Sequence, residues 1–339
     1  MNINLKAVLF KSSNRFDSFL SKMEELGLDV TVLDFVDNDW YEFDFNSVGI
    51  VIYFPSFKFT SDHPLALSEV YDNLQFIKDA YPKIVMFPDP AIISFYNDKY
   101  RQFLFLQKNG FPIPDTIPLF SEQSVKKAVN EFGFPVVIKN RYGAGGDSVF
   151  MANTEEEVMS FYKLSKLNFF HAGGLKMVLK SLTSRGFYYH LIKQKKLKYP
   201  FFSYPLIGQR FIKMERDLKT VTGDYKVVEA HWRVQTDESM WKVNIDGGGI
   251  GEWSYVDQEA LDVSVKLAKA LKTRWINIDL SLSEGKFLIS EFSPVWHHYK
   301  YKEKPNFIYK GDYNIEMPLE QSLDLEQIIV ESLINAVKK

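Results

Sequence analysis

A lysine followed by a glycine-rich loop is the pattern in this chain whose chemistry is most direct. The segment Phe134 to Phe150 reads FPVVIKNRYGAGGDSVF, so an apolar run ends at Lys139 and a loop with Gly143, Gly145 and Gly146 follows. β-Branched residues favour a strand, and glycines permit the positive φ values and close backbone approach that a turn covering phosphates needs. A strand that brings a lysine to such a loop can hold a phosphate chain.

The residues after the loop exclude two common phosphate-binding motifs. Residues 148–152 are predicted to form a returning strand, and the next helix begins only at the capping signal Asn153 or Thr154. A dinucleotide fingerprint or a Walker loop opens directly into a helix, and no GKS or GKT triplet occurs in the chain. We interpret the loop as a hairpin lid over a nucleotide, with an ordinary glycine-rich turn as the alternative.

Three units of secondary structure are predicted to position these residues. Residues 1–95 alternate strand and helix, which predicts a small parallel α/β domain. Residues 96–182 form a second α/β unit, in which a helix capped at Asn97 and a helix from Glu122 to Phe132 precede the strand that bears Lys139. Residues 183–339 form a mixed unit with a largely antiparallel sheet, a Gly223-Asp224 turn, a Glu284-Gly285 turn and a closing helix at 325–337.

Composition narrows the class of protein. The 339 residues are more than one core usually supports, and 46% are hydrophobic, which predicts two or three packed domains. With 41 basic and 43 acidic residues, the net charge of -2 gives no surplus for binding nucleic acid. The absence of cysteine, of a secretory signal and of an apolar run long enough for a bilayer predicts a cytoplasmic protein without a membrane partner. A homo-oligomer is left open.

Five features occur in an order that resembles the ATP-grasp superfamily, in its ribosomal-protein glutamate ligase (RimK)-like branch. The first is NDKYRQFLFLQKNGFPIPDT, in which Lys99 matches a phosphate-contacting lysine, and the second is Lys139. The GAGGDS loop resembles the phosphate-covering lid. The fourth feature is RDLKTVTGDYKVVEAHWR, followed by Asn244 and three glycines. It resembles a segment of this branch that ends on an arginine, which Arg233 matches. INIDLSLSEGKFLISEFSP resembles the metal signature.

The resemblance implies an ATP-grasp fold of α/β and α+β type, with an amino-terminal parallel α/β domain and two lobes that clasp ATP. It implies cofactor-binding residues for ATP: Lys99, Lys139, Gly143, Gly145, Gly146, Ser148, Gln209, Arg210, Phe211, Ile212 and Asp217. It implies Asp279, Glu291 and Ser293 as ligands of one or two Mg²⁺ ions, with Mn²⁺ as a substitute. Arg233, Lys219 and Asn244 are implied as catalytic residues.

The sequence departs from the family pattern at three places. Ser293 stands where the family places asparagine, two residues after the metal-binding glutamate, which puts the second metal in doubt. Lys219 replaces an arginine and keeps the charge without the bidentate fork. Gln209-Arg210 replaces a Gln-Glu pair near the adenine hinge, where the resemblance implies Phe211 and Ile212 as neighbours of the adenine.

Simple electrostatics supports the same assignment. ATP concentrates negative charge, so its site needs lysines near the phosphates and a divalent metal held by hard oxygen ligands. Asp279 and Glu291 flank the Glu284-Gly285 turn, so they could lie on adjacent strands and face one side of the sheet, where both could bind metal. The plainer alternatives are solvated lysines, an edge aspartate paired with a lysine, and a glutamate that caps a loop.

The predicted function is an ATP-dependent carboxylate-amine ligase that forms an amide through an acyl phosphate. Its substrates would be a small-molecule or peptide acid and an amine. The alternatives are a nucleotide-binding protein without ligase activity that acts as a regulatory or assembly partner, and a phosphoryl transferase. Three further segments could meet a substrate but have plainer explanations: the loop 12–14, the lysine-rich run 193–198, and the pair His297-His298.

Overall fold

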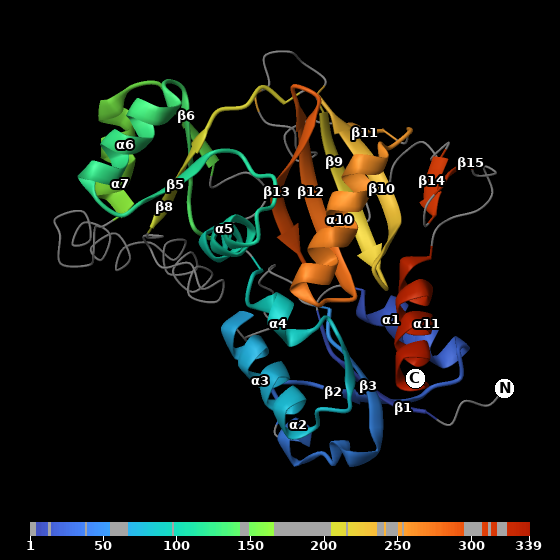
Figure 1. Cartoon of the computed structure of the whole chain (residues 1–339). Coiled ribbons are helices and arrows are strands. Elements are labelled where there is room, and N and C mark those ends of the chain that lie inside the picture. Colours follow the sequence, from blue (N-terminus) through green and yellow to red (C-terminus); the bar gives the residue numbers. More distant parts are fainter. Residues whose placement is uncertain are drawn as a thin grey trace.

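The strands of this chain form separate sheets (Figure 1). Within most of these sheets, the order of the strands in space differs from their order along the chain. In this computed structural model the described residues are 5–12, 15–37, 39–54, 67–96, 98–142, 149–165, 205–214, 216–235, 241, 250–252, 254–294, 307–310, 313–316 and 324–339. Within them lie one parallel sheet of four strands, an antiparallel sheet of four, an antiparallel sheet of five and a two-stranded hairpin. The predicted mixture of α/β and α+β units is confirmed.

The amino-terminal unit is the parallel sheet, with strand order β2-β1-β3-β4. Its strands are β1 (Lys6–Phe10), β2 (Asp29–Leu33), β3 (Val48–Ile52) and β4 (Val85–Phe87). Both faces are buried, because Ala7 and Leu9 join one core with α1 (Phe16–Glu25), while Val8 and Phe10 join another with α3 (Leu67–Ala80). Three short segments complete this unit: α2 (Asp39–Glu42), η1 (Phe45–Ser47) and α4 (Pro90–Ile93).

The four-stranded antiparallel sheet has the order β5-β8-β6-β7 and carries Lys139. Its strands are β5 (Thr116–Leu119), β6 (Val136–Lys139), β7 (Val149–Ala152) and β8 (Leu206–Arg210). Helices α6 (Glu122–Phe132) and α7 (Glu155–Ser165) pack on it and form a core of their own. Because β8 pairs with both β5 and β6, this lobe includes a strand from beyond residue 182.

The five-stranded antiparallel sheet has the order β11-β10-β9-β12-β13. Its strands are β9 (Arg216–Gly223), β10 (Lys226–Val234), β11 (Ile250–Glu252), β12 (Trp275–Ser283) and β13 (Lys286–Ser293). Helix α10 (Gln258–Leu271) covers one face, where Leu261 and Leu267 meet Trp232 and Ile278 (Figure 1). Helix α5 (Lys99–Lys108) lies at the β13 edge, between this sheet and the four-stranded one.

Two hairpin turns join neighbouring strands of the five-stranded sheet, and in each ladder the register shifts by one residue beyond the turn, between Val227 and Glu229 and between Asp279 and Leu280. The β12–β13 turn is the predicted Glu284-Gly285 pair, with φ of 49° and 69°. The β9–β10 turn is Asp224-Tyr225, with φ of 48° and 63°, and so lies one residue later than predicted. Gly223 stays in the strand, where a Cβ atom would lie 2.5 Å from the Trp275 ring, so its role is close approach to that indole.

The closing helix α11 (Leu325–Val337) packs beside α1 against the amino-terminal sheet (Figure 1). Its Leu325, Ile329 and Leu333 share one core with β1 and β3. The hairpin β14 (Phe307–Lys310) and β15 (Tyr313–Glu316) lies beside β10. The region 183–339 thus supplies strands to the four-stranded antiparallel sheet, the five-stranded sheet and the hairpin, and its last helix packs on the parallel sheet.

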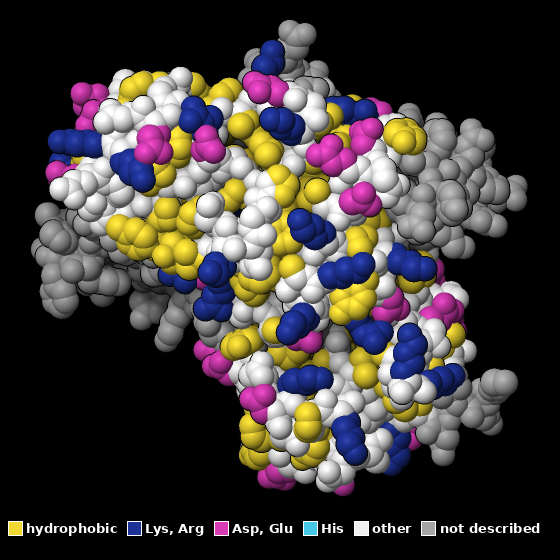
Figure 2. Space-filling view, viewed as in Figure 1, with side chains coloured by type: hydrophobic (Ala, Val, Ile, Leu, Met, Phe, Trp, Pro, Cys, Tyr) yellow, Lys and Arg dark blue, Asp and Glu magenta, His cyan; other side chains and the backbone are white. Residues whose placement is uncertain are grey.

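The surface mixes charge and apolar groups. Figure 2 shows basic side chains over α10 and the amino-terminal unit, with acidic side chains among and around them, and hydrophobic side chains between. Within the described residues, no helix combines the length and apolar character that crossing a bilayer requires.

Candidate active site

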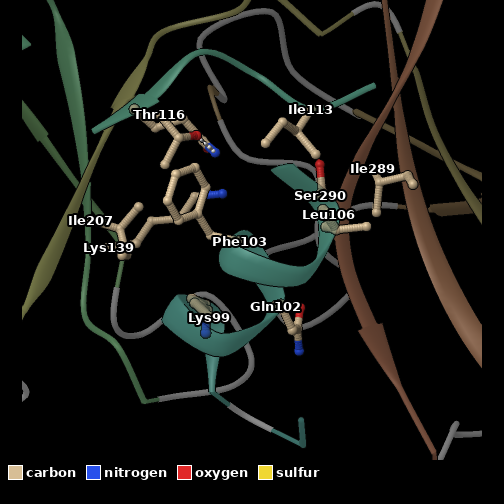
Figure 3. Close-up of a pocket in the computed structure, with 11 residues that line it drawn as sticks. Lys99, Gln102, Phe103, Leu106, Ile113, Thr116, Lys139, Ile207, Ile289 and Ser290 are labelled. Atoms are coloured by element: carbon tan, nitrogen blue, oxygen red, sulfur yellow. Dashed lines mark hydrogen bonds between the residues drawn. The ribbon is translucent and has the colours of Figure 1, made fainter. Parts of the chain in front are cut away.

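A pocket lies where α5 meets the two antiparallel sheets (Figure 3). It encloses about 380 Å³, part of it open to solvent. Its polar lining comes from α5, β5, β6, β8 and β13: Lys99, Gln102, Thr116, Lys139, Gln209 and Ser290. Its apolar lining consists of Phe103, Leu106, Ile113, Ile207 and Ile289. Residues from 99 to 290 therefore converge on one cavity.

The two predicted phosphate-contacting lysines both line this pocket. Lys99 is the first residue of α5, and Lys139 is the last residue of β6. Burial, followed by the positive charge of Lys99, lowers the pKa of Lys139 to about 8, while Glu291 and Asp217 oppose that shift. Two like charges held in a partly buried pocket favour an anionic ligand, so the residues present fit a phosphate group.

A clamp joins the segments that carry these lysines. Asp98 accepts two hydrogen bonds from the Arg141 guanidinium, from Nε at 2.9 Å and from Nη2 at 2.7 Å. Asp98 is also the N-cap of α5 and accepts from the Arg101 backbone N–H at 3.0 Å. The Lys99 backbone N–H donates to the Arg141 carbonyl at 2.8 Å. The start of α5 is therefore tied to the chain that leads from β6 toward the glycine-rich loop.

Gln102 attaches α5 to the edge of the five-stranded sheet. Its Nε2 donates to the Phe292 carbonyl at 2.9 Å, and its Oε1 accepts from the Phe292 N–H at 3.2 Å. Further along, the Ile289 N–H donates to the Pro112 carbonyl at 2.8 Å. These bonds satisfy the outer backbone groups of β13 and fix the strand that carries Glu291.

A buried ionic cluster lies on the face of the five-stranded sheet opposite α10. The β9–β10 register places Asp217 beside Arg233, and the β9–β12 register places Lys219 beside Asp279. Arg233 Nη2 contacts Asp217 Oδ2 and lies 2.9 Å from Asp279 Oδ2. Lys219 Nζ lies 3.0 Å from Asp279 Oδ1. Two cations thus neutralise two carboxylates in a space with little water.

The two carboxylates of this cluster differ in pKa. Burial raises the pKa of Asp217 to about 6, although Arg233 favours its ionised form. Burial would raise the pKa of Asp279 as well, but Arg233 and Lys219 together hold it well below the usual range. Asp279 is therefore the carboxylate that stays ionised over the whole neutral and mildly acidic range.

The predicted carboxylate pair is found across two strands. Asp279 on β12 is the cross-strand partner of Glu291 on β13, so their side chains leave the same face of the sheet. Glu291 makes no ion pair with another described residue, and its charge acts on Lys139 in the pocket. Among the described residues there is no group of three or more histidine, aspartate and glutamate side chains that could hold a metal. A metal would need further oxygen donors beside this pair, and the donor set present fits Mg²⁺ in kind.

The remaining predicted residues fall in three places. Gln209 lines the pocket and donates to Thr116 Oγ1 at 3.0 Å. The Arg210 side chain instead reaches Asp115 at 2.8 Å and stacks on the Phe132 ring, so it does not line the pocket. Phe211 and Ile212 belong to the connection from β8 to β9, and Ser293 ends β13.

Several predicted residues lie outside the described residues. They are Gly143, Gly145, Gly146, Ser148 and Asn244, together with 13–14, Asn97, 193–198 and His297-His298.

Sequence reasoning missed Asp98, Gln102 and Arg141. Asp98 precedes the predicted lysine and is a better cap than Asn97, because its carboxylate faces the free N–H groups of the first turn. The role of Asp98 as the N-cap of α5 could therefore have been predicted from the sequence. The pairing of Asp98 with Arg141 and of Gln102 with Phe292 spans 43 and 190 residues, and no local pattern reports contacts of that kind.

Similarity to known proteins defines the class. Residues 96–169 match the family model of the RimK-like ATP-grasp domain. This part of the chain is therefore similar to a RimK-like ATP-grasp domain, and the overall fold is the ATP-grasp fold of the solved ligases that the chain resembles.

The curated relatives are synthases and ligases. Beta-citrylglutamate synthase B of Mus musculus is 25% identical over 207 residues, which are 59% of this chain and 44% of that protein. N-acetylaspartylglutamate synthase A of Homo sapiens is 22% identical over 200 residues, or 57% of this chain and 42% of that protein. Coenzyme gamma-F420-2:alpha-L-glutamate ligase of Methanocaldococcus jannaschii is 23% identical over 199 residues, or 58% of this chain and 57% of that protein. The matches to the first two cover less than half the length of those proteins.

Solved structures extend the likeness to nearly the whole chain. The ATP-grasp ligase PsnB, solved with a phosphomimetic variant of its minimal precursor, Mg and ADP, has a TM-score of 0.61 at 12% identity and covers 99% of this chain and all of that one. The D-alanine–D-alanine ligase of Bacillus anthracis has a TM-score of 0.59 at 12% identity, with 99% of this chain and 97% of that one covered. At these identities the likeness concerns the fold.

Proposed function

We propose that this chain is an ATP-dependent carboxylate-amine ligase that requires Mg²⁺. The observation that carries the proposal is the convergence of Lys99 and Lys139 in one pocket, with the Glu291 and Asp217 charges of the facing sheet close enough to act on Lys139. Such a site offers cations for a phosphate chain and oxygen ligands for the metal that accompanies it.

The pocket suits a nucleotide in two parts. Lys99 and Lys139 bind the phosphate oxygens as ammonium ions. Ile207 and Ile289 face each other from the two sheets and give the apolar walls that a purine ring needs (Figure 3). Gln209 and the backbone of the β8–β9 connection, including Phe211 and Ile212, meet the edge of the base. The side chain of Arg210 supports this segment from outside through Asp115.

Asp279 and Glu291 would hold Mg²⁺ with Ser293 near them, and the ion supplies positive charge that neutralises the phosphates. Asp279 fits this role because Arg233 and Lys219 keep it ionised. Glu291 fits because no described residue forms an ion pair with it.

The proposed ligation has two steps. A carboxylate oxygen of the acid attacks the γ-phosphorus of ATP, the bond to the β-phosphate oxygen breaks, and ADP leaves. The amine then attacks the acyl carbon, loses a proton, and displaces phosphate to give the amide. Arg233 and Lys219 stand beside the carboxylates and stabilise the negative charge that develops on the acyl oxygens, with Asn244 as a further donor.

The names of the relatives support an amino acid as one substrate. Those of the two synthases and the archaeal ligase above each include glutamate or a glutamyl product. We infer an amino-acid or peptide amine, and a cytoplasmic setting in which ATP and Mg²⁺ are abundant.

Hydroxylamine tests the proposal whatever the natural amine is, because it replaces that amine in the second step. Purified protein is incubated with ATP, Mg²⁺ and panels of amino-acid and peptide acids, and ADP and hydroxamates are measured together. A ligase gives a hydroxamate with an equal amount of ADP, and Glu291→Ala abolishes both while leaving the unfolding midpoint near that of the wild type. Nucleotide binding without ADP release from any acid would instead favour the regulatory alternative. ADP release with a stable phosphorylated product and no hydroxamate would indicate a phosphoryl transferase.

A further inference from the structure

Four polar residues form a square on the two strands that carry the proposed metal ligands. Asp279 is the cross-strand partner of Glu291, and Asn277 is the cross-strand partner of Ser293, in an uninterrupted part of the β12–β13 ladder. Residues two apart on a strand share a face, and direct cross-strand partners do too. Asn277 and Ser293 therefore face the same side as Asp279 and Glu291, one step along the strands.

Asn277 is buried in a way that its structural setting does not explain. The residue is 4% exposed, and its side-chain oxygen is shielded from solvent with no hydrogen-bond partner among the described residues. Leaving a buried amide oxygen without a partner costs on the order of 1–3 kcal/mol. Ile276 and Ile278, which precede and follow Asn277 in β12, point into the apolar core under α10, on the opposite face of the sheet. The packing of that core therefore does not require a polar residue at position 277. The burial points to a partner that the described residues do not supply.

The proposed ligands Asp279 and Glu291 supply too few oxygen atoms to complete the coordination of Mg²⁺. Mg²⁺ takes six oxygen ligands in near-octahedral geometry, and carboxylates usually share the sphere with waters and phosphates. Both Asp279 oxygens face cations, with Lys219 Nζ at 3.0 Å and Arg233 Nη2 at 2.9 Å. The described residues around the pair offer no third acidic or histidine ligand. A neutral oxygen donor on the same face would add a ligand without adding charge to this crowded cluster.

We propose that Asn277 is an oxygen ligand of the metal held by Asp279 and Glu291, and that it is the amide ligand of this site in place of a longer side chain at Ser293. The inference rests on the proposed function, since it assumes that a metal-nucleotide complex binds here. Exchange of the oxygen and nitrogen of the carboxamide by a half-turn of χ2 lets the oxygen face either side. The carboxamide thus supplies a hard oxygen ligand. Ser293, its cross-strand partner, has a short side chain that leaves space for the carboxamide.

Mn²⁺ is the probe, because free Mn²⁺ is quantified by electron paramagnetic resonance without any turnover. Full-length protein with saturating ADP is titrated with Mn²⁺, and the wild type is compared with Asn277→Ala, Asn277→Asp, and Asn277→Ala combined with Ser293→Asn. Thr222→Val is the matched control, because Thr222 is a buried polar residue on the opposite face of the same sheet. Thermal unfolding of each variant without metal separates folding from metal binding.

Loss of one ligand is expected to weaken Mn²⁺ affinity by at least ~10-fold in Asn277→Ala. Asn277→Asp, which keeps an oxygen donor, holds or strengthens that affinity. Ser293→Asn in the Asn277→Ala background restores it to within about 3-fold, because the amide returns on the adjacent strand. Thr222→Val leaves it unchanged even if its unfolding midpoint falls.

Two results would overturn the inference. If the wild type binds Mn²⁺ in the presence of ADP and Asn277→Ala binds it equally well, the proposed function stands and Asn277 is not a ligand, its oxygen being paired with a trapped water. If the wild type binds no Mn²⁺ with ADP, the metal-nucleotide site itself fails, and the proposed function fails with it.

Discussion

The buried charged side chains of this molecule are the groups whose binding and catalytic roles can be predicted most directly. The Lys99–Lys139 pair carries positive charge into the pocket, and the cluster around Arg233 holds two carboxylates and two cations on the neighbouring sheet. Because such groups are costly to desolvate, each is sensitive to pH, to ligands and to the loss of a partner. The residue-scale predictions test these two groups separately.

Lys139 is predicted to take up a proton when a nucleotide binds. With a pKa of about 8 in the free protein, roughly half of the Lys139 side chains are neutral at pH 8, and bound phosphates raise that pKa. ADP affinity is therefore constant below about pH 8 and falls as the pH rises above it. Isothermal titration calorimetry at pH 8 in buffers of different ionisation enthalpy should give an uptake approaching half a proton.

Lys139→Arg is the control for this prediction. Arginine stays protonated throughout this pH range, so the variant keeps the charge and loses the proton uptake. An observed enthalpy that is the same in every buffer for the wild type would contradict the prediction.

Arg233 is predicted to stabilise the fold as well as the site. It lies between Asp217 and Asp279 and is 7% exposed. Arg233→Met leaves Asp217 buried without its cation, which should lower the free energy of unfolding by about 3–5 kcal/mol in urea denaturation. Adding Asp217→Asn should recover much of that loss, because Asp279 keeps Lys219 as a partner. Equal stability of the single and double variants would show that the Asp217–Arg233 pair is not the source.

At the scale of elements, the clamp between α5 and β6 holds two segments whose lysines repel each other. Asp98→Asn keeps an oxygen for the helix cap and removes the charge that binds Arg141. We expect ADP affinity to fall about 3- to 10-fold as Lys99 and Lys139 separate, an effect comparable to the net contribution of one neutral hydrogen bond. Calorimetric titration of ADP at pH 7 measures it.

The matched control is Arg101→Ala. Arg101 is half-exposed and lies 4.0 Å from Asp98, so its loss should change ADP affinity less than 2-fold. A double-mutant cycle of Asp98→Asn with Arg141→Gln should show strong coupling between the two positions. Independent, additive effects would mean that the clamp does not position the lysines.

Most elements were predictable because their signals are local. The helices 122–132 and 325–337 have the bounds that capping and periodicity indicate, and the Glu284-Gly285 turn was predicted as well. Counting back from that turn pairs Asp279 with Ser290, so the turn alone does not give the Asp279–Glu291 pair; a one-residue register shift between Asp279 and Leu280 brings Asp279 opposite Glu291. Long-range pairing was not predictable. No local pattern shows that β8 enters the sheet of β6, that α5 docks on β13, or that Asn277 faces Ser293 in the same square as the carboxylates.

At the scale of the whole molecule, two of the four hydrophobic cores among the described residues differ in how many parts of the chain they join. One core joins the amino-terminal sheet, α1 and α11 to Val221 and Trp275 of the five-stranded sheet. The Trp275 indole N–H also donates to Ser332 Oγ of α11 at 3.3 Å, and Arg15 Nε lies 2.6 Å from Glu326. The lobe that carries Lys139 has a separate core, built only from β5 to β8, α6 and α7. A cavity made in the shared core therefore does not reach the core of that lobe.

This division predicts which regions unfold together. Ile329→Ala opens a cavity in the core shared by α11 and both the parallel and the five-stranded sheets, and should cost about 2–5 kcal/mol. Hydrogen exchange followed by mass spectrometry should show lower protection in β1, β3, β9 and β12 together, with β6 and α6 unchanged. Val125→Ala is the matched control, because Val125 is fully buried in the separate lobe and should lower protection there alone. Loss of protection confined to β1 and β3 in Ile329→Ala would mean that α11 does not couple the amino-terminal unit to the sheet that holds Asp279, since a shared core must transmit the cavity to every element that lines it.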